Sequence, residues 1–180
     1  TGAGKTEMTI QPMVKVLAKK GESMIITDPK GEIYEKNALE LKEKGYNIVL
    51  LNFRNPQNGN CWNPLNLPYQ LYQTGNQDKA CELLEDLAAN ILYDENNKGG
   101  DPFWEKTSAD YFAGLALALF KDAKAEEINL NSINLMTTAG EDKIGNTTYI
   151  KEYFSDKDQG SPEYINVAST LMAPNETKSS

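Results

Sequence analysis

The chain has 180 residues and a formal net charge of −8, a length sufficient for one domain or for part of a domain with an insertion. It holds no run of about 18 apolar residues of the kind that spans a membrane. It has no histidine, and its two cysteines, Cys61 and Cys81, fit no Cys-x-x-Cys pattern. These counts exclude a cysteine–histidine zinc site, a histidine-based catalytic triad and an imidazole base within this chain. For the cysteines, buried free thiols in a cytosolic protein are favoured over a disulfide.

Charge is divided unevenly along the chain. Residues 1–65 carry nine basic and seven acidic side chains, a net of +2, whereas residues 66–180 carry nine basic and nineteen acidic ones, a net of −10. Affinity for nucleic acid comes mainly from Lys and Arg side chains at the phosphates. Residues 66–180 are therefore not expected to bind DNA well. A protein partner with a basic surface is favoured there, and a merely solvated acidic face is the alternative.

The first six residues, Thr1-Gly2-Ala3-Gly4-Lys5-Thr6, match the end of a phosphate-binding loop, G-x-x-x-x-G-K-[ST]. Small residues let backbone N–H groups turn toward a polyphosphate, and a helix starting at Thr6 adds its own N–H groups and dipole. Lys5 is expected to reach the β- and γ-phosphates, and the Thr6 hydroxyl to complete a Mg²⁺ shell. The first glycine of the pattern would precede residue 1, so we expect a piece of a longer protein. The alternative is a glycine-rich turn without a ligand.

The next four segments alternate between helical and strand patterns: residues 6–20, 24–27, 33–44 and 47–52. Pro12 is expected to kink or delay the first helix, and Gly21 to cap its end. Alternation of helices with short β-branched strands predicts an α/β fold with a mostly parallel sheet.

The string Asp28-Pro29-Lys30-Gly31-Glu32 follows the first predicted strand. In an open α/β sheet, ligands bind at the carboxyl ends of the strands. Asp28 and Glu32 are therefore the candidate catalytic groups. In the simplest interpretation, Asp28 is also the acid that binds Mg²⁺. The more usual meaning of such a string is a turn with a capping acid.

Beyond a turn-rich connector at residues 54–68, every long periodic segment has helical spacing. Helices are predicted at residues 78–93, from Asp101-Pro102 through Leu119, and at 131–139, 147–154 and 161–173.

These patterns predict three parts. Residues 1–68 are expected to be the N-terminal part of a nucleotide-binding domain. Residues 69–155 are expected to form a compact all-α insert without a β-sheet, and residues 156–180 a linker and a return helix. The side chains expected to be buried in the insert are Trp104, Phe112, Leu115 and Leu119. Its densest acidic clusters are Asp94-Glu95 with Asp101, and Glu126-Glu127 with Glu141-Asp142.

Four motifs, in this order, resemble the type IV secretion coupling proteins, which are the TraG-like ATPases of bacterial conjugation: Thr1-Gly2-Ala3-Gly4-Lys5-Thr6, Asp28-Pro29-Lys30-Gly31-Glu32, Trp62-Asn63-Pro64-Leu65 and Asp101-Pro102-Phe103-Trp104. The resemblance spans essentially the whole chain. It implies a partial RecA-like P-loop nucleotide-binding fold, interrupted after its third strand by an inserted all-α helical bundle, with ATP and Mg²⁺ as cofactors.

The resemblance also implies a function. Such proteins recruit relaxase-bound DNA or protein substrates and drive their transfer through a conjugation channel, as a homohexamer at the cytoplasmic face of the bacterial cytoplasmic membrane. An upstream segment would anchor the protein there, next to the secretion channel components, while the present piece is expected to be soluble. The acidic insert is expected to bind a relaxase or transfer adaptor protein, and DNA to pass through the full-length motor instead.

The chain also departs from the family pattern. The Walker B aspartate and catalytic glutamate are expected beyond Ser180, so we expect no ATP hydrolysis by this piece, and whether it acts as an enzyme by itself stays open. The family places Asp28, Lys30 and Glu32 beside the nucleotide or at a subunit contact. Two other functions are alternatives: a helical module that binds substrate or adaptor without catalysis, and an unrelated P-loop kinase with a helical lid.

Overall fold

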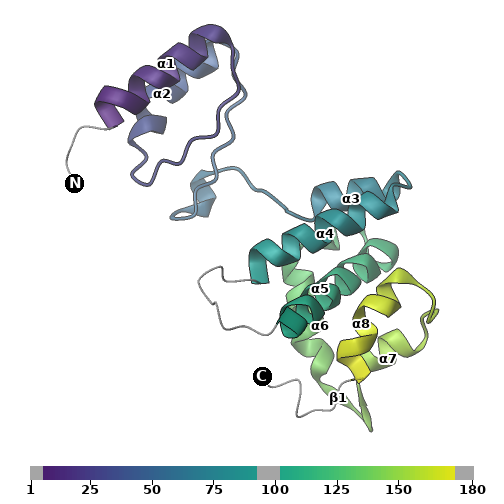
Figure 1. Ribbon diagram of the computed structural model, residues 1–180. Helices are drawn as coiled ribbons and strands as arrows, with labels where there is room; N and C mark the ends of the chain where they lie inside the picture. The colour runs from purple at the N-terminus through teal and green to yellow at the C-terminus, as the bar shows by residue number, and fades with distance from the viewer. Residues whose placement is uncertain (1–5, 93–101, 173–180) are drawn as a thin grey trace. The chain divides into compact units, whose positions relative to one another are not determined.

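The computed structural model describes residues 6–92 and 102–172 (Figure 1). The chain divides into two compact units between Trp62 and Asn63. The domain boundaries expected from the sequence stay a prediction.

The first unit begins with a π-helical turn, η1 (Thr6–Ile10), that continues into α1 (Gln11–Lys20). Pro12 lies in the first turn of α1, directly after the π-helical turn, where the regular α-helical hydrogen-bond pattern begins. The regular α-helix therefore starts later than Thr6, as the position of Pro12 predicts. At its end Gly21 has φ 72°, the left-handed conformation of the expected glycine cap.

Helix α2 (Glu32–Glu43) lies beside α1 (Figure 1). The two helices share a buried polar contact, in which the Asn37 side-chain amide donates to Gln11 Oε1 at 2.7 Å and to the Ile33 carbonyl at 2.7 Å. Val14 and Ile33 are the most deeply buried apolar residues of this pair, each 4% exposed. A buried hydrogen bond of this kind favours one register of the two helices.

The two strands expected in this unit are not paired in the part of the chain that the structure describes. Residues 24–27 and 47–52 run without a β-ladder, and Ile25 and Val49 are exposed. Near the short turn η2 (Pro56–Asn58), the Asn60 N–H donates to the Leu50 carbonyl at 2.7 Å. A strand makes its backbone hydrogen bonds with a neighbouring strand, and no such partner is described for these segments, so the α/β part of the expected fold is not confirmed.

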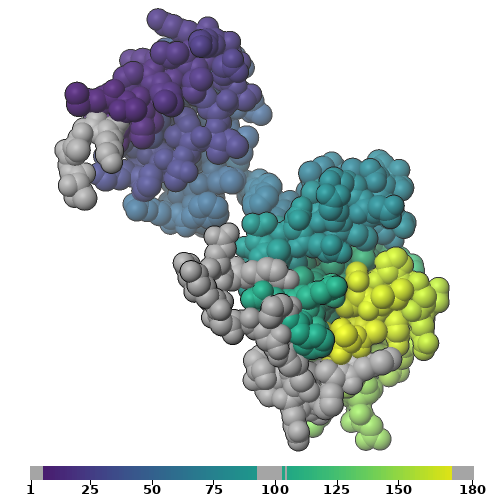
Figure 2. Space-filling view, in the orientation of Figure 1, coloured from purple at the N-terminus to yellow at the C-terminus, as the bar shows by residue number. Residues whose placement is uncertain are grey.

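The second unit is a helical bundle, as the spacing predicts. Its helices are α3 (Asn66–Gln73), α4 (Gln77–Leu92), α5 (Pro102–Asp122), α6 (Leu130–Thr137), α7 (Tyr149–Ser155) and α8 (Pro162–Met172), with 3-10 turns η3 (Ala125–Glu127) and η4 (Ala139–Glu141). Helix α5 is central: α4, α6 and α8 pack against it, and α3 packs on α4 (Figure 1). Helix α8 belongs to this unit and forms part of its surface (Figure 2).

One feature of the expected bundle was wrong. A short antiparallel hairpin, β1 (Lys143–Ile144) with β2 (Thr147–Thr148), lies inside the region that was expected to lack β-structure. Its two-residue turn places Gly145 at φ 59°, which glycine adopts without steric cost. Because Thr148 is used in β2 and its side chain accepts the Lys151 N–H, α7 starts later than predicted.

The core of the bundle surrounds α5. Phe112 and Leu115 are buried, which confirms two of the four expected core residues, and Leu119 is half-buried against the same core. The Trp104 side chain lies outside the described part. Among the described residues, no helix is long and apolar enough to cross a membrane.

Candidate functional site

Of the phosphate-loop motif, only Thr6 is described, and it lies in the first turn of η1. Residues 1–5, with Lys5, lie outside the described residues, so the nucleotide site stays a prediction. Within those that are described, no cluster of acidic, cysteine or histidine side chains has the arrangement of a metal site.

Asp28 is a helix cap. One oxygen of its carboxylate, Oδ2, accepts the backbone N–H groups of Ile33 at 2.8 Å and Tyr34 at 2.9 Å, at the start of α2. Helices leave such N–H groups without an intrahelical partner, and a carboxylate there also meets the positive end of the helix dipole. The geometry thus matches the capping alternative, and a catalytic role for Asp28 stays a prediction.

Glu32 lies at the same end of α2. It forms an exposed ion pair of 3.8 Å with Lys30 and stands one helical turn from Lys36. Lys36 in turn donates to the carboxylate of Glu7 in η1, and this hydrogen bond holds the pKa of Lys36 above its usual 10.5. The structure therefore brings the turn that contains Thr6 and the residue Glu32 to one end of α2.

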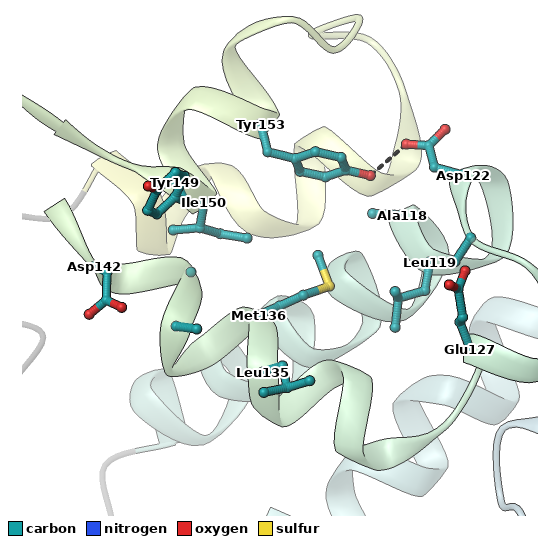
Figure 3. Close-up of a pocket in the computed structure, with 13 residues that line it drawn as sticks. Ala118, Leu119, Asp122, Glu127, Leu135, Met136, Asp142, Tyr149, Ile150 and Tyr153 are labelled. Atoms are coloured by element: carbon teal, nitrogen blue, oxygen red, sulfur yellow. Dashed lines mark hydrogen bonds between the residues drawn. The ribbon is translucent and has the colours of Figure 1, made fainter. Parts of the chain in front are cut away.

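A second candidate site is an open apolar groove of about 630 Å³ in the helical unit (Figure 3). It lies between the C-terminal half of α5 and the segment from α6 through α7. Its lining residues are Ala118, Leu119, Asp122, Ala123, Glu127, Leu135, Met136, Ala139, Gly140, Asp142, Tyr149, Ile150 and Tyr153.

Apolar side chains form the middle of the groove. Met136 projects from α6 into the space between Leu119 and Tyr153 (Figure 3). Leu135 and Tyr149 also line the groove but are 52% and 54% exposed. Large apolar side chains that remain half exposed around a hollow are typical of a surface that binds another molecule.

Carboxylates stand at both ends of the groove. Asp142 lies at one end, and Asp122 and Glu127 lie at the other (Figure 3). Glu127 Oε2 accepts the Lys124 backbone N–H at 2.9 Å, whereas the Asp142 side chain has no hydrogen bond or ion pair within the described part of the chain.

Asp122 is held in its charged form. Burial would raise the pKa of its carboxyl, but Lys157 and the Tyr153 hydroxyl, which donates at 2.5 Å, lower that pKa below its usual value of 3.8. Burial and the bond to Asp122 raise the pKa of the Tyr153 phenol. At neutral pH this end of the groove therefore carries a carboxylate and a neutral phenol.

The structure unites part of what the sequence indicated. Glu127 and Asp142 both belong to the acidic cluster Glu126-Glu127 with Glu141-Asp142 that was noted from the sequence, and both line this groove. The other cluster, Asp94-Glu95 with Asp101, lies outside the described residues. The apolar residues Leu135, Met136 and Tyr149 were missed, because their proximity depends on how α6 and α7 fold back and no local sequence pattern reports it.

Comparison with known proteins gives the family. A family model described as type IV secretory system conjugative DNA transfer matches residues 1–180. The chain belongs to this family. A search of the curated proteins and a search of the solved structures found no match. Family membership establishes involvement in conjugative DNA transfer by a type IV secretion system, in agreement with the resemblance seen in the sequence.

Proposed function

We propose that the chain is the P-loop and helical segment of an ATP-dependent coupling protein. This protein recruits relaxase-bound DNA or protein substrates and drives their transfer through a type IV secretion system. The observation that carries the proposal is the family match over residues 1–180, with Gly4-Lys5-Thr6 at its start. An unrelated P-loop kinase is disfavoured, because the match also includes the helical unit.

The residues present have the chemistry that ATP and Mg²⁺ require. Lys5 would pair with the β- and γ-phosphates, the backbone N–H groups of residues 1–6 would surround the phosphates, and the Thr6 hydroxyl would bind Mg²⁺. A RecA-like sheet is part of the proposal. Residues 24–27 and 47–52 would be strands of it, and their exposed apolar residues, such as Ile25 and Val49, would be covered by neighbouring elements.

The uneven charge of the two parts of the chain supports different binding roles for them. The strongly acidic second part would bind a basic surface of a relaxase or transfer adaptor protein, and the DNA would pass through the motor instead. The full assembly would be a homohexamer at the cytoplasmic face of the bacterial membrane, next to the channel components. A binding role without catalysis is the second candidate for this chain, and the groove in the helical unit favours it.

The test is Lys5→Ala, introduced into the gene at its natural locus. We expect transfer to recipient cells to be abolished, because the cation that meets the developing charge on the γ-phosphate is lost. Lys42→Ala, which removes one exposed charge from the last turn of α2, is the control and should leave transfer unchanged. Normal transfer by the Lys5→Ala strain, at normal protein level, would contradict the proposal.

A further inference from the structure

We propose that the groove between α5, α6 and α7 binds a short basic segment of a partner protein, with one large apolar side chain seated over Met136. This inference deepens the proposed function, on which it rests, because it assigns substrate or adaptor recognition to particular residues. It commits to one occupant, a peptide segment with Lys or Arg on both sides of an apolar anchor.

The size and lining of the groove suit an anchor side chain. Its volume of about 630 Å³ falls within the roughly 300–1,000 Å³ of ligand sites. Met136 lies in the middle, and methionine adapts its shape to different apolar partners. Leu135 and Tyr149, both half exposed, would lose solvent contact on binding, and removal of their apolar surface from water would favour the complex.

The charges around the groove select a basic occupant. Carboxylates stand at both ends, Asp142 at one and Asp122 with Glu127 at the other (Figure 3), and no lining residue in the described part is basic. The Asp142 side chain has no hydrogen bond or ion pair among the described residues, and Glu127 uses only one of its carboxylate oxygens in a hydrogen bond. Two sets of acceptors separated by an apolar middle match a segment with basic residues on both sides of its anchor.

The same charges disfavour a nucleic acid in this groove. A phosphate backbone would face carboxylates at both ends and would find no lysine or arginine among the described lining residues. Lys157, which stands near one end, is already paired with Asp122. Single-stranded DNA is therefore an outcome of the test and not the proposed occupant.

The test uses the 180-residue chain and a fluorescently labelled synthetic peptide with a central Leu-Phe pair between two Lys-Lys pairs. Fluorescence anisotropy measures its dissociation constant. Two matched peptides are compared, one with Ala-Ala in the centre and one with Glu in place of every Lys. We expect the Ala-Ala peptide to bind at least about tenfold more weakly, and the Glu peptide not to bind.

Matched variants locate the binding. Glu127→Gln with Asp142→Asn removes two charges from the groove, and Glu85→Gln with Asp86→Asn removes two exposed charges from α4. Leu135→Ser changes the groove wall, and Leu67→Ser changes a leucine of similar exposure, 57%, on α3. We expect each groove variant to raise the dissociation constant of the Leu-Phe peptide by about tenfold or more. Each control should change that constant by less than about twofold. Unchanged melting temperatures exclude unfolding as the cause.

Three results would overturn the inference. The first is that the Leu-Phe peptide does not bind. The second is that the groove charge variant and the α4 charge variant weaken binding of this peptide equally, which would show nonspecific electrostatic attraction. The third is binding of a labelled single-stranded oligonucleotide that Leu135→Ser abolishes. None of these results affects the expected outcome for Lys5→Ala. The hypothesis of peptide binding in the groove and the hypothesis of an ATP-dependent motor can therefore be rejected independently.

Discussion

At the scale of single residues, Gly114 determines how closely two helices of the bundle approach. A Cβ at this position would lie 2.6 Å from Val167 Cγ1 and 2.9 Å from the Glu163 carbonyl oxygen, so α8 would have to move away from α5. We expect Gly114→Ala to lower the free energy of unfolding by roughly 1–3 kcal/mol, the usual cost of overpacking. Urea unfolding measures it.

Gly160→Ala is the matched control for this substitution. Its added Cβ would meet only ordinary contacts of 3.5 Å or more, all with Asp158, so little change is expected. Equal stability of the Gly114→Ala and wild-type chains would show that α5 and α8 do not pack as closely as described.

The ion pair between Lys121 and Glu163 predicts a dependence of stability on pH. Burial of Glu163 would raise the pKa of its carboxyl. The hydrogen bond from Lys121, at 2.6 Å, the charge of Lys121 and further hydrogen bonds, one of them with Ser161, together outweigh burial and hold that pKa below the usual 4.5. A carboxyl with a lowered pKa in the folded state stabilises the protein fully above its unfolded pKa. That stabilisation is lost as the pH falls through the folded value.

We therefore expect Glu163→Gln to reduce the loss of stability between neutral pH and about pH 3. Urea unfolding at several pH values measures the effect on the helical unit. Glu152→Gln, at an exposed position of α7, is the charge-matched control and should keep the wild-type profile. If the pH profiles of Glu163→Gln and wild type coincide, the ion pair has no such role.

At the scale of elements, the start of α2 depends on Asp28. Asp28→Ala removes an acceptor from the N–H groups of Ile33 and Tyr34, and we expect it to cost about 0.5–2 kcal/mol of helix stability. Hydrogen exchange of these two amides should become faster, and Lys30→Ala, at a neighbouring exposed position, should leave it unchanged. Slow exchange at both amides in Asp28→Ala would show that the carboxylate is not the cap.

Helices of this chain were more predictable than strands, for a physical reason. A helix makes its hydrogen bonds within one segment, so the spacing and Gly21 were sufficient to predict where α1 ends, and Pro12 indicated that its start would be kinked or delayed. A strand makes its hydrogen bonds with another segment. Residues 47–52 have strand composition, yet no partner strand is described for them, so composition alone did not predict the observed structure.

The hairpin at residues 143–148 was missed although it has a local signal. Gly145-Asn146 is a two-residue loop of the type that favours tight hairpins, but only two residues pair on each side. The groove was only partly predictable. Its charges were visible as Glu126-Glu127 and Glu141-Asp142, whereas its apolar middle is assembled from α5, α6 and α7 and has no signature in any one of them.

At the scale of the whole molecule, charge predicts how the chain interacts with DNA. Residues 66–180 carry a net of −10, so their surface repels a polyanion. We expect the 180-residue chain to show no saturable binding of a labelled single-stranded oligonucleotide at an ionic strength of about 0.15 M, where exposed charges are screened over about 8 Å. Fluorescence anisotropy over a series of salt concentrations measures this.

Any weak binding at low salt should come from the first unit, where Lys19 and Lys20 are both exposed at the end of α1. Lys19→Ala with Lys20→Ala should remove it, whereas Lys143→Ala with Lys151→Ala, two positions in the helical unit, should leave it unchanged. Affinity for phosphates depends on the local positive potential, and neighbouring carboxylates offset the potential of isolated lysines. Tight binding with a steep salt dependence that is lost only with Lys143 and Lys151 would refute the charge argument and make the helical unit a DNA-binding element.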